Sequence, residues 1–168
     1  MSDWSCAKCR SWLRLAAMLE VDIRELRQGP VETLGALAPD DPTFEGLELD
    51  LTGPLSVEGR LQETAEGEYF WRGRMAGAVK TVCRRCLTEL TCPVEADVSV
   101  MFSSDPDAAD DPGVYPVAAS SRSLDVRPVV REELALAAPA FPLCREDCAG
   151  LCPTCGADLN AGPCSCNP

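Results

Sequence analysis

Cysteine residues crowd the C-terminal part of the chain and are spaced like metal ligands. Six of the eleven cysteines lie between Cys144 and Cys166. In the run Cys152-Pro153-Thr154-Cys155-Gly156, two thiols lie on one tight turn. Proline presets the backbone of such a turn, and glycine permits the close approach that lets backbone N–H groups point at the sulfurs. A turn of this kind supplies half of a tetrahedral site made of four thiolates.

Four cysteine pairs in the chain have this character, and they allow two groupings. The tail contributes three pairs, and the run Cys83-Arg84-Arg85-Cys86 contributes the fourth. In the first grouping, Cys152, Cys155, Cys164 and Cys166 hold one ion, while Cys144, Cys148, Cys83 and Cys86 hold a second. In the rival grouping, Cys144, Cys148, Cys152 and Cys155 share a single ion. The spacing leaves both groupings open.

Zinc is the metal ion that these thiols are predicted to bind. Disulfides would imply export, yet residues 1–30 lack the uninterrupted apolar segment and cleavage site of a signal peptide. The spacing does not follow the runs that bind iron–sulfur clusters in ferredoxins, which leaves such a cluster as the lesser alternative. Ligation by cysteine alone, in local pairs, predicts a closed structural site rather than a catalytic one.

Composition argues for a binding protein rather than an enzyme. The 168 residues include no histidine, so the commonest general base is missing, and no glycine-rich phosphate loop is present. The formal net charge of −12 disfavours capture of a nucleic-acid backbone by the whole surface and makes a basic protein the natural complement. No apolar run reaches the eighteen residues of a membrane span.

The pattern of apolar residues predicts an α+β fold. Residues 47–51 and 55–61 alternate strictly between apolar and polar side chains, and residues 68–80 and 87–102 form two longer runs of strand character. These runs predict an antiparallel β meander, either open or closed into a barrel-like sheet. A helix is expected at about 125–138, capped by Asp125, with Pro128 in its first turn. It would pack on the sheet and lead into the zinc module.

Three segments follow from this reading. Residues 1–17 contain the pair Cys6 and Cys9, which is either a metal half-site or part of an N-terminal extension ahead of a true start at Met18. We favour the extension, non-native or disordered. Residues 18–142 form the β-rich domain, and residues 143–168 form the cysteine-rich zinc module.

One basic stretch opposes the acidic balance of the chain. No acidic residue occurs between Glu68 and Glu89, and this interval begins with three aromatic residues at 69–71. Its cations are Arg72, Arg74, Lys80, Arg84 and Arg85. Basic residues mixed with aromatic ones suit RNA contact through phosphate pairing and base stacking. Alternatively, the arginines offset the charge of a zinc tetrathiolate, which is formally −2.

The order of these motifs resembles the bacterial YceD family, named for large ribosomal RNA subunit accumulation. The resemblance covers about residues 18–168. It rests on the segment at 21–27, the turn Cys83-Arg84-Arg85-Cys86-Leu87, the helix segment at 131–134, and above all the tail from Leu143 through Asn160 to Cys164-Ser165-Cys166.

The resemblance implies a cytoplasmic accessory factor that supports accumulation of the 23S rRNA without a catalytic activity. Its partner would be a basic ribosomal or assembly protein, rRNA, or both, within a pre-50S particle. The alternative is a zinc- or redox-responsive regulator whose cysteines release metal on oxidation. The sequence leaves the oligomeric state open.

Overall fold

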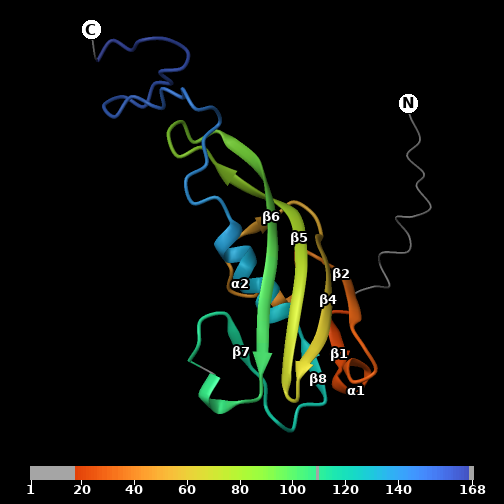
Figure 1. Cartoon of the computed structure of the whole chain (residues 1–168). Helices are drawn as coiled ribbons and strands as arrows, with labels where there is room; N and C mark the ends of the chain where they lie inside the picture. The colour runs from red at the N-terminus through yellow and green to blue at the C-terminus, as the bar shows by residue number, and fades with distance from the viewer. Residues whose placement is uncertain (1–17, 109, 167–168) are drawn as a thin grey trace, which may run out of the picture.

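The computed structural model describes residues 18–108 and 110–166, so the expected extension at residues 1–17 lies outside the described residues. A six-stranded sheet dominates the fold (Figure 1). Its main path runs β2-β4-β5-β6-β7, and β3 pairs with β5 beside that path. The strands are β2 (Val31–Leu37), β3 (Asp50–Leu51), β4 (Leu55–Ala65), β5 (Glu68–Val82), β6 (Glu89–Ser103) and β7 (Val114–Pro116).

The sheet is open rather than barrel-like, which corrects one form of the expectation. β2 and β7 stand at opposite ends of the strand order, and within the described residues no pairing joins them. From β2 to β6 every neighbouring pair is antiparallel, as a meander requires, whereas β7 runs parallel to β6. The fold is therefore a mixed α+β structure built mostly of strands.

Alternation along the strands separates a buried face from an exposed one. Trp71, Met75 and Val79 of β5 are almost completely buried, whereas Arg72 and Arg74 between them are exposed. The buried face packs against α2 (Arg127–Ala137), which contributes Val129, Val130 and Leu134 to the core. Because successive side chains of a strand point to opposite faces of the sheet, one set lies in the core and the other in water.

The helix that was expected at about 125–138 begins at Arg127. Val126 occupies the N-cap position and makes no capping hydrogen bond through its side chain. The Asp125 carboxylate instead accepts a hydrogen bond from the backbone N–H of Arg127 at 2.9 Å. Asp125 therefore lies one residue before the N-cap position. Pro128 follows in the first turn, where its missing N–H costs no helical hydrogen bond.

Short elements complete the chain. β1 (Glu20–Asp22) pairs with β8 (Ser123–Asp125) in a separate two-stranded sheet. The remaining elements are α1 (Ile23–Leu26) and two 3-10 turns, η2 (Pro42–Phe44) and η3 (Pro106–Ala108). The strand expected at 47–51 is wrong over most of its length, because only Asp50 and Leu51 pair, with Lys80 and Val79.

The β5–β6 hairpin carries the candidate site. Its two strands have 15 residues each and pair in register from Glu68 and Ser103 to Val82 and Glu89. The hairpin extends beyond the rest of the sheet, and its tip lies beside the C-terminal segment (Figure 1). Residues separated by some sixty positions in sequence therefore meet at one end of the molecule.

Candidate metal centres

The first cysteine cluster joins the tip of the β5–β6 hairpin to the segment that follows α2. We call it cluster 1, and it consists of Cys83, Cys86, Cys144 and Cys148. Their sulfur atoms all lie within 4.8 Å of one another. The Sγ atoms of Cys83 and Cys148 are 3.9 Å apart, and those of Cys86 and Cys144 are 3.6 Å apart. A tetrahedral zinc ion with Zn–S bonds of about 2.3 Å sets its sulfurs about 3.8 Å apart, so cluster 1 fits zinc.

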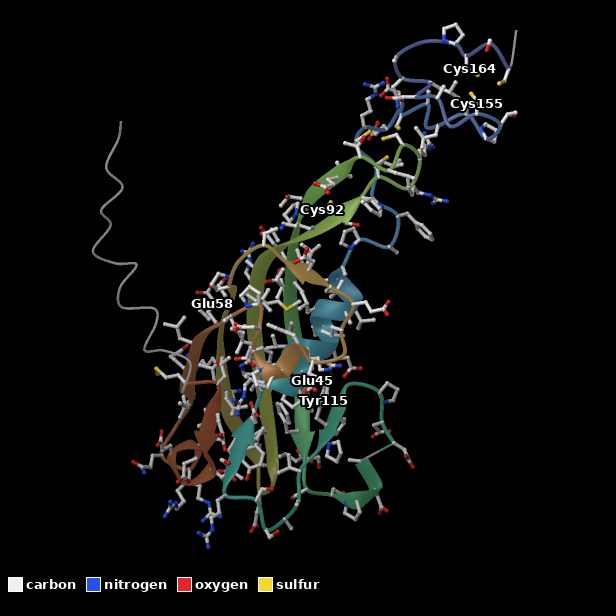
Figure 2. The ribbon with its side chains drawn as sticks, turned by 180° about the vertical axis from the view of Figure 1, so that it is seen from behind. Glu45, Glu58, Cys92, Tyr115, Cys155 and Cys164 are labelled. Atoms are coloured by element: carbon white, nitrogen blue, oxygen red, sulfur yellow. The ribbon has the colours of Figure 1, made fainter. Side chains whose placement is uncertain are left out.

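The second cluster lies entirely within the tail. We call it cluster 2, and it consists of Cys152, Cys155, Cys164 and Cys166, whose sulfurs also lie within 4.8 Å of one another. Figure 2 shows Cys155 and Cys164 close together at the end of the molecule remote from Tyr115. Cys152 is buried, whereas Cys155 and Cys166 are exposed. Cluster 2 is thus the more open of the two.

The geometry brings the cysteines together in the first of the two groupings that the sequence left open. Cys144 and Cys148 gather with the hairpin pair and not with Cys152 and Cys155. Cys92 lies on β6, outside both clusters. The pair Cys6 and Cys9 lies outside the described residues. Each cluster offers four thiolates, so an ion bound there would have no open coordination position and would act structurally.

Hydrogen bonds lower the pKa of at least one thiol in each cluster, and in cluster 1 the Thr88 hydroxyl and backbone also lower the pKa of Cys86. Hydrogen bonds from the backbone of Cys86, and then of Cys144 and Arg85, lower the pKa of the Cys83 thiol to about 6 against burial. The N–H groups of Cys155 and Thr154 likewise lower the pKa of Cys152 to about 6. Hydrogen bonding to Cys148, together with burial, raises the pKa of Cys144 to about 12. In cluster 1 the crowded thiols therefore cannot all ionise near neutral pH without a cation among them.

Arg85 ties the hairpin tip to the tail. Its backbone carbonyl accepts a hydrogen bond from the N–H of Leu151 at 3.0 Å. Its guanidinium Nη1 donates to the carbonyls of Cys148, at 2.8 Å, and Glu146, at 3.2 Å. Gly150 permits this approach, since it has a φ of 76° and a Cβ there would lie 2.9 Å from the Arg85 oxygen. Arg85 is thereby held by contacts within the chain, although it lies at the exposed hairpin tip.

Asn160 links the two clusters, a role that sequence reasoning missed. Its Oδ1 accepts hydrogen bonds from the N–H of Ala149 and from Arg145 Nη2, both at 2.8 Å. Its Nδ2 lies 3.6 Å from the Sγ of Cys148 and can donate to it. Asn160 belongs to the segment between Cys155 and Cys164, yet it supports a ligand of cluster 1. Its position five residues after Cys155 carries no signal of this contact.

The five cations of the basic stretch, which the sequence suggested as RNA contacts, occupy different surroundings. Arg74 forms an ion pair with Glu95, and Arg72 has no ion pair among the described residues. Lys80 lies in a surface depression that Asp50 and Glu89 also line. Arg84 and Arg85 lie on the loop at the hairpin tip. The basic stretch is therefore a line along the hairpin rather than one cluster.

The sheet face around Arg72 is mixed in charge. Its cations Arg60, Arg72 and Arg74 stand among acidic residues of the neighbouring strands, which are Glu32, Glu58, Glu95 and Asp97. Of the three aromatic residues that suggested base stacking, Tyr69 and Trp71 are buried in the core. Phe70 alone is partly exposed on the same face. This arrangement offers little room for stacking and no net positive charge.

Comparison with known proteins identifies the family. Residues 71–168 match the model described as "Large ribosomal RNA subunit accumulation protein YceD". The chain belongs to the YceD family. The match spans more than half of the chain and includes most of β5, all of β6 and α2, and both cysteine clusters. YceD is not a known enzyme family.

Relatives occur among mycobacterial proteins. An uncharacterized protein of Mycobacterium tuberculosis is 29% identical over 160 residues, which cover 89% of this chain and 74% of the relative. A similar protein of Mycobacterium leprae is 26% identical, with 84% of this chain and 68% of the relative covered. No solved structure matches the chain. Among the described residues, no helix has the length and apolar character needed to cross a membrane.

Proposed function

We propose that this chain is an accessory factor in the biogenesis of the large ribosomal subunit that supports accumulation of the 23S rRNA. It acts by binding, in the cytoplasm, and it catalyses no reaction. The observation that carries the proposal is the family match, which includes the hairpin and both cysteine clusters. The absence of histidine from the whole chain supports a role without general acid–base chemistry.

Zinc in the two clusters holds the binding surface together in this proposal. Cys83, Cys86, Cys144 and Cys148 hold one ion, and Cys152, Cys155, Cys164 and Cys166 hold the other. The bound ions supply structural cross-links and no reactive centre. Cluster 1 fixes the tip of the hairpin against the tail, while Arg85 and Asn160 orient the loops that carry the ligands.

The partner is a basic ribosomal or assembly protein, together with rRNA, within a pre-50S particle. The chain as a whole has a net charge of −12, which suits a basic protein surface. Arg72, Arg74, Lys80, Arg84 and Arg85 are the candidate contacts to rRNA. Because the rest of the surface repels phosphate, binding to isolated RNA should be weak at physiological salt.

Depletion of the protein from its native cells tests the proposal. The ratio of 23S to 16S rRNA should fall, and the tagged protein should sediment with pre-50S particles in a sucrose gradient. A strain that expresses only the chain with Cys83 and Cys86 replaced by serine should show the same fall in the rRNA ratio as the depleted strain. An unchanged rRNA ratio, with the protein found only at the top of the gradient, would contradict the proposal.

A zinc- or redox-responsive regulator is the second candidate, favoured by the exposure of Cys155 and Cys166. Hydrogen peroxide would take two electrons from a pair of these thiolates, which would form a disulfide and release the ion. If this role holds, mild peroxide should release zinc from cluster 2 and change the partner of the protein. An accessory factor would lose particle association without gaining another partner.

A further inference from the structure

Leu87, at the tip of the hairpin, combines two unfavourable features. Its φ of 59° makes it the one non-glycine residue with positive φ in the part of the chain that the structure describes. Its side chain is also 61% exposed, so it gains little from burial. A left-handed conformation is costly for a residue with a Cβ, and such strain persists where the surroundings impose it and clusters at functional sites.

The tail contains a matched turn without this strain. Gly156 follows Cys155 as Leu87 follows Cys86, and it adopts a φ of 73°. Its N–H donates to the carbonyl of Cys152 at 2.9 Å, and the N–H of Leu87 donates to the carbonyl of Cys83 at the same distance. Glycine therefore satisfies the requirements of this turn. The leucine at position 87 has no evident role in forming it.

Other exposed apolar side chains lie at the same tip. Phe141 is 71% exposed, and the guanidinium of Arg84 lies over its ring at 4.5 Å from the centroid. The backbone N–H of Arg84 also donates to the carbonyl of Pro142 at 2.9 Å, which holds this segment against the loop. Val82, the last residue of β5, is 46% exposed. Three of the five exposed large apolar residues of the described chain thus belong to this tip.

We propose that Leu87, with Phe141 exposed at the same hairpin tip, forms a docking surface for a protein segment that offers an apolar pocket rimmed by basic side chains. The inference rests on the proposed function and assigns the protein contact of the pre-50S particle to the hairpin tip. Leu87 is the anchor that enters the pocket. Glu89 follows Leu87 by two residues, and the backbone carbonyl of Glu146 accepts a hydrogen bond from Arg85, so both residues lie near the tip. Their carboxylates form no ion pair among the described residues and supply the charge that attracts a basic rim.

A protein partner fits this surface better than RNA does. An aliphatic side chain such as Leu87 cannot stack on a base, whereas it can fill an apolar pocket. Arg84 covers the Phe141 ring and Arg85 donates to the carbonyls of Cys148 and Glu146, so of the five candidate contacts to rRNA these two are the least available. Thiolates that ligate zinc add negative charge nearby, which opposes a phosphate backbone.

The substitution Leu87→Gly separates docking from folding. It removes the backbone strain, so we expect the melting temperature to rise by about 2–4 °C with the zinc content unchanged. Loss of the anchor should weaken association with purified pre-50S particles about tenfold. Leu136→Ala is the control, because Leu136 is 73% exposed on α2 and should leave association unchanged. Unchanged association of the Leu87→Gly protein would overturn the inference.

Cross-linking identifies the class of partner. Phe141→p-benzoylphenylalanine keeps an aromatic ring at an exposed position and reacts with nearby C–H bonds on irradiation. In pre-50S particles we expect its product to contain a basic protein, and a product that contains rRNA instead would overturn the inference. Failure of the unsubstituted chain to bind the particles contradicts the proposed function itself. Normal binding that survives Leu87→Gly contradicts only the docking role of Leu87.

Discussion

The indole Nε1 of Trp71 donates a hydrogen bond to Oγ1 of Thr33, 2.9 Å away on a strand that is not its neighbour. β4 lies between them, and the indole reaches over it through space left by two glycines. A Cβ at Gly73 would lie 2.4 Å from the indole Cζ2, and a Cβ at Gly59 would lie 2.7 Å from Nε1. The buried hydroxyl of Thr33 thus has its partner only because both positions lack a side chain.

Gly73→Ala should therefore destabilise the sheet. The added methyl group must displace a fully buried indole, and overpacking of this kind costs about 1–3 kcal/mol. Urea denaturation followed by Trp fluorescence measures the change in the free energy of unfolding. Gly53→Ala is the matched control, since no atom lies within 4 Å of its added Cβ. Equal stabilities for the two variants would contradict this account of the Trp71 contact.

Two zinc ions per chain are expected in protein purified without chelator. The two clusters are separate sets of four thiols, so Cys83→Ser should remove one equivalent and Cys152→Ser the other. Elemental analysis by mass spectrometry counts the ions, and Cys92→Ser serves as the control because Cys92 belongs to neither cluster. Less than about half an equivalent of zinc, accompanied by disulfides, would refute metal binding.

Chelation should unfold the tail and the hairpin tip while the main sheet stays folded. Residues 144–166 bury little apolar surface, whereas zinc contributes about 10–16 kcal/mol to the folding of zinc-finger peptides. Hydrogen exchange with and without chelator measures the effect. Protection should disappear in the tail and around Cys83–Cys86 and persist across residues 55–82. Tail amides that remain protected after zinc removal would show that the metal is dispensable for folding.

Zinc affinity should fall as the pH drops, and it should fall more steeply below about pH 6. The pKa values of Cys83 and Cys152 are lowered from 9.0 to about 6, so their thiolates exist above that pH and are lost as the pH falls through it. At pH 7 each ion should release fewer than four protons, because at least one thiol in each cluster is already ionised. Calorimetric titration in buffers of different ionisation enthalpy counts these protons. Release of four per ion at pH 7 would contradict the lowered pKa values.

Charge reversal on the sheet tests the RNA contacts separately. Arg72→Glu should weaken association with pre-50S particles and reduce its salt dependence by about one unit of log slope. Arg74→Glu should have less effect, because the Arg74 guanidinium is already paired with Glu95. Sedimentation over a range of salt concentrations compares the two variants. If neither substitution changes association, the sheet face does not contact rRNA.

The sequence predicts those strands in which every second residue is apolar and these apolar residues are the ones that face the core. β4, β5 and β6 meet this condition, whereas β2 does not. Thr33 and Gly35 occupy the buried face of β2 because the indole of Trp71 and the side chain of Leu19 fill the space above them. A polar and a small residue replace the expected apolar ones, so the alternation disappears. The strand could not be recognised without the tertiary contacts.

The segment at 47–51 shows the opposite case. Leu47, Leu49 and Leu51 alternate perfectly, yet Leu47 and Leu49 pack against the core without pairing in the sheet. Apolar spacing reports burial, and it does not require a hydrogen-bonded neighbour.

Cysteine spacing predicted the candidate ligands in both clusters but not their grouping. Local pairs such as Cys152 and Cys155 follow from turn geometry, which the sequence contains. The meeting of the hairpin tip with Cys144 and Cys148 depends on the length of the hairpin and the direction in which the chain leaves α2. Neither property is visible in the spacing itself.

Cluster 1 also sets the order of events during synthesis. The thiols of Cys83 and Cys148 are separated by 65 positions, so a ribosome must add the whole of β6, α2 and the following loop before the set is complete. A nascent chain can pair β4 with β5 and close the turn from Cys83 to Thr88 earlier, but it cannot fix that turn against Cys144 and Cys148. Only molecules that have been translated at least through Cys148 can present the finished hairpin tip, which keeps incomplete chains from occupying the docking position on a particle.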